Sequence, residues 1–128
     1  MTRRSFSLLL YGTLALLVGC QDRAEYLELK DLDAAERQVV ERFVVLERAR
    51  AVALADPPRG AAILDSLAAA WGDSAAQEAE ASLTSEPDRA HLIHDLLRRV
   101  LVAEQDSLIH APEPRRLTAP LPAPVPPD

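Results

Sequence analysis

The chain has 128 residues, a formal charge of −6 and a composition of 48% hydrophobic, 27% charged and 4% aromatic residues. This length allows one domain and excludes a multidomain enzyme, and the composition fits neither a disordered chain nor a polytopic membrane protein. Because the chain has a single cysteine, Cys20, it cannot form an intramolecular disulfide.

The first nineteen residues have the features of a secretory signal peptide. Arg3 and Arg4 precede an apolar run from Leu8 to Val18. Eleven residues form a helix of about 16 Å, which is too short to cross a hydrocarbon core about 30 Å thick. A basic start followed by a short apolar run is typical of a signal that is removed, and we predict that residues 1–19 are cleaved.

The apolar run ends in a four-residue pattern, Leu17-Val18-Gly19-Cys20. This pattern resembles the lipobox of bacterial lipoproteins. The resemblance implies cleavage between Gly19 and Cys20 and attachment of acyl chains to Cys20, which becomes the first residue of the mature chain. Stable attachment takes more than one membrane signal, and several acyl chains on one cysteine supply it. We therefore predict that Cys20 anchors the mature protein to a bacterial membrane, on its periplasmic face.

Two further features bear on the export route and on the choice of membrane. Residues 2–6 resemble the twin-arginine export signal, but we find no cofactor motif of the kind that such cargo often carries. The general secretory route is therefore favoured, and the twin-arginine route stays open. Gln21 favours the outer membrane in a Gram-negative source, because aspartate after the cysteine is associated with inner-membrane retention. Asp22 weakens this inference.

The mature chain is acidic. Removal of residues 1–19 leaves 12 basic and 20 acidic side chains, a formal charge of −8. This balance argues against nucleic acid as a partner and against a polybasic grip on anionic lipids. The full chain, residues 1–19 included, has thirteen arginines and a single lysine, Lys30. We interpret this bias as a consequence of genome composition.

Composition divides the mature chain into three segments. Residues 20–32 are predicted to be the lipidated cysteine and a tether, residues 33–110 a helical domain, and residues 111–128, which hold seven of the ten prolines, a tail. No stretch between Cys20 and His110 alternates with the period of a strand, so we predict an all-α bundle of three to four helices. The tail is expected to be a disordered chain with polyproline II character, and a spacer or a groove ligand is the alternative.

The first helix is marked at both ends. Asp33 and Glu36 have the spacing of a capping box. Asp56-Pro57-Pro58 ends the helix, because proline restricts the preceding residue and donates no backbone hydrogen bond. Between these limits apolar residues recur at steps of three and four, at Ala35, Val39, Phe43, Leu46, Ala49 and Ala53.

Two helices are expected to follow. The first runs from about Arg59 to Trp71 and ends at Gly72, where a left-handed C-cap belongs. A short helix then covers residues 74–83. We expect Phe43 and Trp71 to anchor the core, and the alternative is that one of them lines a groove for a peptide or a lipid.

The last predicted helix begins after a serine cap, Ser85, and carries Pro87 in its first turn, where a missing N–H is harmless. It runs to about Ile109. Its apolar residues recur at helical intervals, at Ile93, Leu96, Leu97, Val100, Leu101 and Leu108.

Several capping and packing positions recur together within residues 63–108. They are Ile63-Leu64-Asp65-Ser66-Leu67, Trp71-Gly72, Ser82-Leu83, Pro87, Leu96-Leu97, Val100 and Asp106-Ser107-Leu108. This arrangement resembles a group of small helical bacterial lipoproteins of unknown function, in which tyrosine is more usual at the position of Trp71. The resemblance covers about half of the mature chain. It implies a helical fold and brings no active site with it.

Two histidines are the candidates for metal binding. His91 and His94 lie three residues apart and share one face of the last helix, so their imidazoles could bind one ion. Asp95 points about 100° away from His94, and His110 lies more than about 20 Å farther along a straight helix. We therefore interpret the histidines as exposed or half-buried side chains, and we predict no metal and no cofactor.

The sequence contains no phosphate-binding loop, nucleophile elbow or His-Glu-x-x-His pattern. Because lipidation is predicted to consume the Cys20 thiol, we do not expect an enzyme. The favoured hypothesis is a membrane-anchored, non-catalytic helical module that contacts another envelope protein. The alternative is a carrier that holds an apolar ligand or a lipid between its helices.

Overall fold

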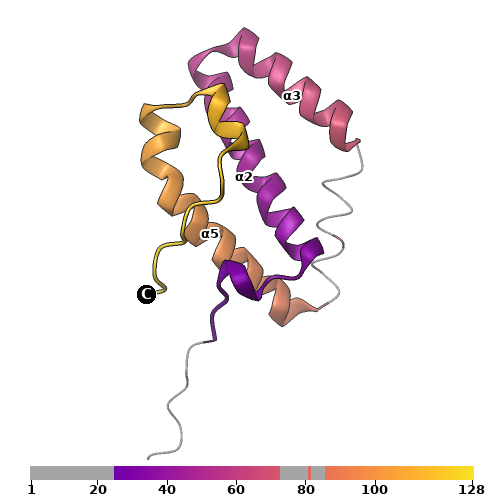
Figure 1. The fold of residues 1–128 in the computed structure, drawn as a ribbon, viewed down its shortest axis with the longest axis vertical. Coiled ribbons are helices and arrows are strands. Elements are labelled where there is room, and N and C mark those ends of the chain that lie inside the picture. Colours follow the sequence, from indigo (N-terminus) through magenta and orange to yellow (C-terminus); the bar gives the residue numbers. More distant parts are fainter. Residues whose placement is uncertain (1–24, 73–80, 82–85) are drawn as a thin grey trace, which may run out of the picture.

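The described residues form an all-helical fold. In the computed structural model these residues are 25–72, 81 and 86–128. They form the helices α2 (Ala34–Ala55), α3 (Pro57–Trp71) and α5 (Pro87–His110) and the 3-10 helices η1 (Leu29–Asp31) and η2 (Pro114–Thr118), with no strand among them (Figure 1). The predicted fold class, a small all-α bundle, is confirmed. The predicted signal peptide, and the short helix expected at 74–83 except for Ala81, lie outside the described residues.

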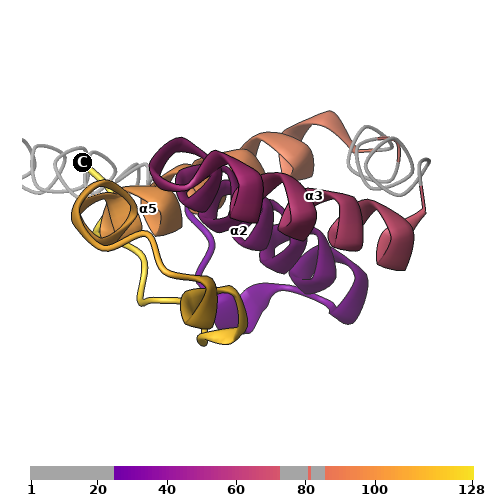
Figure 2. The same cartoon turned by 90° about the horizontal axis from the view of Figure 1, so that it is seen from above.

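Helix α2 is the element against which the others pack. It contacts α3, α5 and η2. Figures 1 and 2 show α3 running back along α2, while α5 crosses α2 on another side. As a result, α5 has one side turned toward α2 and another side turned away from the core.

Local capping signals fix the ends of α2 and the start of α3. The Asp33 carboxylate accepts from the Glu36 backbone N–H at 2.8 Å, and the Glu36 carboxylate accepts from the Asp33 N–H at 2.9 Å, which confirms the capping box. Asp56 ends α2 and caps α3, where it accepts from the Arg59 N–H at 3.3 Å. Helix α3 therefore begins at Pro57 and not near Arg59, because proline is well tolerated in a first turn.

The hairpin of α2 and α3 is closed by a glycine. A Cβ atom at Gly60 would lie 2.1 Å from the Ala53 Cα, so only glycine allows the two backbones to approach this closely. At the other end of α3, Gly72 has a φ of 79° and its N–H donates to the Ala68 carbonyl at 2.9 Å. The glycine C-cap with a positive φ is thus confirmed, but the ψ of Gly72, 158°, lies outside the left-handed helical region that was predicted.

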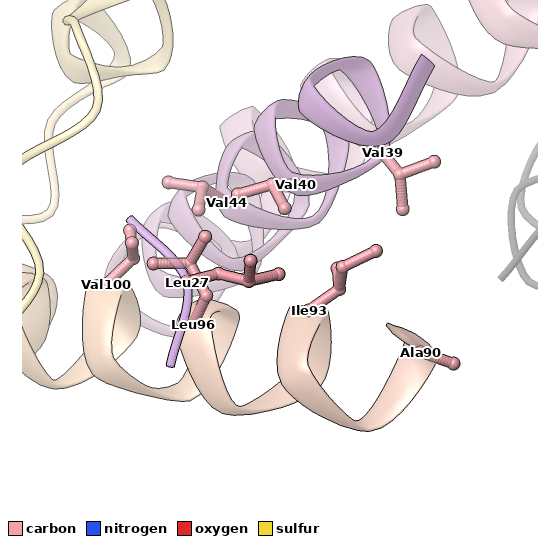
Figure 3. Packing of buried hydrophobic residues seen from close by; sticks show 8 residues of the cluster. All are labelled: Leu27, Val39, Val40, Val44, Ala90, Ile93, Leu96 and Val100. Carbon is pink, nitrogen blue, oxygen red and sulfur yellow. The ribbon is translucent and has the colours of Figure 1, made fainter. Parts of the chain in front are cut away.

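The hydrophobic core lies between α2, α5 and the chain start (Figure 3). Its buried members are Leu27, Val39, Val40, Val44, Ala90, Ile93, Leu96 and Val100. The buried face of α2 is thus rotated from the predicted stripe, because α5 covers Val40 and Val44, whereas Phe43 is half-buried at the core margin. Trp71 is also half-buried, with the Arg42 guanidinium 5.6 Å from its ring. Neither aromatic residue is a central core anchor.

The segment that precedes α2 belongs to the folded domain. Residues 25–32 were expected to be part of a tether, but Leu27 is buried in the core against α5, and Leu29 and Leu32 pack around it. These residues pack on the helices because the core between α2 and α5 is small, and their apolar side chains complete it.

The proline-rich segment also packs against the helices. The prediction of a disordered tail does not describe it: residues 114–118 form η2, Leu121 packs on the core, and the Val125 N–H donates to the Arg99 carbonyl at 3.3 Å. Proline removes backbone donors but keeps every carbonyl acceptor. Buried arginine donors from α2 and α5 bind these carbonyls, so the segment stays extended and becomes ordered.

Arg48 of α2 is the first of these donors. Its side chain is buried and forms a two-pronged ion pair with buried Glu104 of α5, with the Arg48 Nε donating to the Glu104 Oε2 at 2.9 Å. The same guanidinium donates to the Ala119 carbonyl at 2.7 Å and to the Pro120 carbonyl at 3.1 Å. Arg48 therefore joins α2, α5 and the tail. The arginine content has a structural use that genome composition does not explain.

Arg99 of α5 is the second buried donor, and it binds both ends of the described chain. Its Nε donates to the Asp95 carboxylate at 2.9 Å, one Nη to the Val125 carbonyl at 3.3 Å and the other to the Leu27 carbonyl. The guanidinium also lies 5.6 Å from the Tyr26 ring. The chain start and the tail are thus fastened side by side against α5.

The ion pair of Arg48 and Glu104 leads to a first prediction. Arg48→Met leaves a buried carboxylate without its partner, so we expect the free energy of unfolding to fall by about 3–5 kcal/mol. Urea unfolding followed by circular dichroism measures this loss. Replacing both partners, as Arg48→Met with Glu104→Leu, should recover much of it, because no buried charge remains.

The control for this prediction is Arg50→Met. Arg50 forms an exposed ion pair with Glu47, so its loss should cost less than about 1 kcal/mol. Equal destabilisation by the Arg48 and Arg50 variants would contradict the role assigned to the buried pair.

Candidate interaction surface

The predicted lipidation site precedes the described residues. Leu17, Val18, Gly19 and Cys20 lie outside them, and the described chain begins at Glu25. Cys20 is five residues before Glu25, and five residue steps span at most about 18 Å whatever path the chain takes. Because Leu27 is already packed in the core, a lipid on Cys20 would hold the domain close to the bilayer.

The two candidate metal ligands, His91 and His94, are exposed on α5. Asp95, the nearest carboxylate in sequence, hydrogen bonds to the Arg98 and Arg99 guanidiniums and is therefore engaged elsewhere. The described residues contain no group of three side chains that could hold a metal ion. The structure thus brings no third ligand to the histidine pair.

The third histidine, His110, has a partner of its own. Its Nδ1 lies 3.0 Å from the Asp106 carboxylate and 3.1 Å from the Asp106 carbonyl. His110 therefore belongs to the end of α5 and not to a site with His94, as the spacing along the helix predicts.

An apolar surface of the described residues runs along α5. We define the outer face of α5 as the residues that line a shallow hollow of about 490 Å³, which are His94, Leu97, Arg98, Leu101, Val102, Gln105, Leu108 and Ile109. Val102 and Ile109 are 45% and 62% exposed. Leu97 and Leu101 of this face are half-buried and pack against the core cluster, and Leu108 is half-buried near the end of α5.

The polar residues of this face are neutral or cationic. The described outer face contains no acidic side chain, although the chain carries 20. The neighbouring acids on α5 are engaged elsewhere: Asp95 pairs with Arg98 and Arg99, buried Glu104 pairs with Arg48, and Asp106 lies beside His110. An apolar stripe with cationic margins is the pattern of a helix that contacts another surface.

A second hollow lies where the two chain ends meet on α5. Its volume is also about 490 Å³, and its lining includes Tyr26, Lys30, Arg99 and Val125. Lys30 lies 2.6 Å from Glu28, and the hydrogen bond and charge of Glu28 raise the pKa of Lys30. Both hollows are open to solvent, so they are grooves and not enclosed cavities.

Two carboxylates near these segments carry shifted pKa values. The Arg89 guanidinium donates two hydrogen bonds of 2.8 Å to the Glu36 carboxylate. These bonds lower the pKa of Glu36 and outweigh the effect of burial. Burial raises the pKa of Asp95, but the hydrogen bonds and charges of Arg98 and Arg99 together hold it below its usual value. Both carboxylates therefore stabilise the fold in their ionised form.

The buried charges carried a signal that the sequence analysis missed. Arg48 continues the row of Val40 and Val44 at steps of four, and Glu104 follows Val100 at the same step on α5. A charged residue in each of two apolar rows, with opposite signs, indicates a buried pair.

Comparison with known proteins adds no relative. No family model, curated protein or solved structure matches this chain. Among the described residues, no helix is both long enough and apolar enough to span a membrane.

The shifted carboxylates predict acid sensitivity. Because their pKa values are lowered on folding, their contributions are complete above the ordinary values, 4.5 for Glu36 and 3.8 for Asp95, and are lost as the pH falls through the folded values. We expect the urea concentration at the unfolding midpoint to decrease as the pH is lowered from about 5 to about 2. Glu36→Gln should flatten this decline.

Arg89→Gln provides the matched control. Added to Glu36→Gln, it should change the pH dependence little further, because Glu36 is the carboxylate to which Arg89 hydrogen bonds and the charges of Asp33 and Asp31 act on it less. A decline of unaltered slope in Glu36→Gln would show that other groups cause the acid sensitivity.

Proposed function

We propose that this chain is a bacterial envelope lipoprotein, anchored to a membrane through Cys20, and that its helical domain is a non-catalytic module that contacts another envelope protein. The observation that carries the proposal is the pattern Leu17-Val18-Gly19-Cys20 at the end of a short apolar run that Arg3 and Arg4 precede. A basic start, a short apolar run and a small residue before the cysteine are what processing of a signal peptide requires.

The start of the packed domain supports a role at the membrane. Leu27, seven residues after Cys20, is buried against α5, so the link to the anchor is at most about 25 Å long. A domain held this closely meets partners that lie in the membrane or beside it. It does not reach across the envelope.

Open hollows favour the interaction module over the carrier. A carrier would enclose most of its ligand. The hollows lined by described residues are open grooves, which suits a contact surface better.

Cys20→Ala tests the anchor. The proposal expects that cells expressing the full chain incorporate labelled palmitate into it, and that the Cys20→Ala variant incorporates none and leaves the membrane fraction. Ser5→Ala, outside the four-residue pattern, is the matched control and should label normally. Palmitate in the Cys20→Ala variant would defeat the lipoprotein assignment.

Co-purification tests the contact with another protein. Affinity purification of the tagged, full-length protein from detergent-solubilised envelopes of its source should return a protein in stoichiometric amount. The control is an unrelated tagged lipoprotein from the same envelopes. Recovery of no stoichiometric protein after chemical cross-linking would contradict the interaction module and leave the anchor untouched.

A further inference from the structure

The outer face of α5 and the start of the described chain lie on adjoining sides of the same helix. Arg99, which binds the Leu27 carbonyl and faces the Tyr26 ring, is three residues before Val102 of the outer face, and residues three apart are neighbours on a helix surface. The chain start and the tail meet beside Arg99, where Tyr26 and Val125 line one groove, and Leu27 is buried in the core that α2 and α5 share. The route to Cys20 therefore leaves the domain next to the outer face.

The length of chain between the domain and Cys20 limits what can lie there. Five residues reach at most about 18 Å from Glu25, whereas the outer face extends over about 18 Å from Leu97 to Ile109 at 1.5 Å per residue. A bilayer that holds lipid chains on Cys20 thus lies within about 18 Å of Glu25, whatever path the linking residues take.

We propose that the outer face of α5 lies on the surface of the bilayer in which Cys20 is anchored. This inference rests on the lipid anchor of the proposed function and adds the orientation of the domain to it. Exposed Val102 and Ile109 and half-buried Leu108 enter the interfacial layer, as the apolar face of an interfacial helix does. Leu97 and Leu101 support this face from the side of the core.

The composition around the face fits a lipid surface. Its polar residues, His94, Arg98 and Gln105, include no acid, so the face avoids the repulsion that the acidic remainder of the chain has from anionic headgroups. Tyr26, which is 46% exposed beside α5, is an aromatic residue of the kind enriched at bilayer interfaces.

A weak contact is sufficient at this place. The anchor makes the docking of α5 an intramolecular event, so the effective concentration of the bilayer at the face is high. A few partly exposed apolar side chains can then set the orientation, although they would not recruit the domain from solution.

The test uses the full-length, lipidated protein with one introduced cysteine, which is its only free thiol when Cys20 is acylated. Ile109→Cys probes the outer face, and Leu54→Cys, an exposed leucine at the end of α2, is the matched control. Each is labelled with bimane and reconstituted in phosphatidylethanolamine–phosphatidylglycerol vesicles that contain lipids brominated on their acyl chains. We expect several-fold stronger quenching at position 109 than at position 54, and the same at Val102→Cys.

Palmitate labelling of the same preparations separates the two proposals. Acylated protein with equal quenching at positions 109 and 54 overturns the orientation and leaves the anchor standing. Absence of palmitate overturns the anchor and the orientation with it. A probe at position 109 that is unquenched in vesicles but shielded in intact envelopes also overturns the inference, because a protein then occupies the face.

Discussion

The buried guanidinium of Arg48 is the constraint on which the rest of this structure depends. A charge removed from water must be paired and hydrogen bonded, and Arg48 meets this requirement with the Glu104 carboxylate and with the carbonyls of Ala119 and Pro120. Two helices and the tail are therefore held by one side chain. A segment so poor in backbone donors would otherwise gain little from packing, since its polar groups could only accept.

Arg99 applies the same chemistry to the other end of the chain. It binds the carbonyls of Leu27 and Val125, so the first and last packed segments meet on α5. Helix α5 consequently has three environments around its circumference: the core toward α2, the two chain ends beside Arg99, and the outer face. The asymmetry of α5 follows from where its arginine lies, because the chain ends cover only the side to which the guanidinium is directed.

Local capping signals made the ends of the helices predictable, whereas the packing of the tail depends on hydrogen-bond donors that are distant in the sequence. Asp33, Asp56 and Gly72 act on neighbours within four residues, and each was readable from the sequence. The tail was not, because its order depends on Arg48, 71 residues away from Ala119. Periodicity also placed Leu97 and Leu101 on α5 without showing which of two adjacent apolar stripes faces the core. Their place on the candidate surface emerged only when α2 was packed on α5.

The position of α3 completes the argument about orientation. Gly60 brings α3 against α2 at the backbone, and α3 runs along a side of α2 different from the one that α5 crosses (Figures 1 and 2). If α5 rests on the bilayer, the α2–α3 hairpin is the part turned toward the aqueous side. Leu54, an exposed leucine, lies at the end of α2, where the hairpin turns. A protein partner would then meet the hairpin, and the lipid would meet α5. In that orientation one small core supports two surfaces, because Arg99 binds both chain ends beside α5 and Arg48 joins the tail to α2.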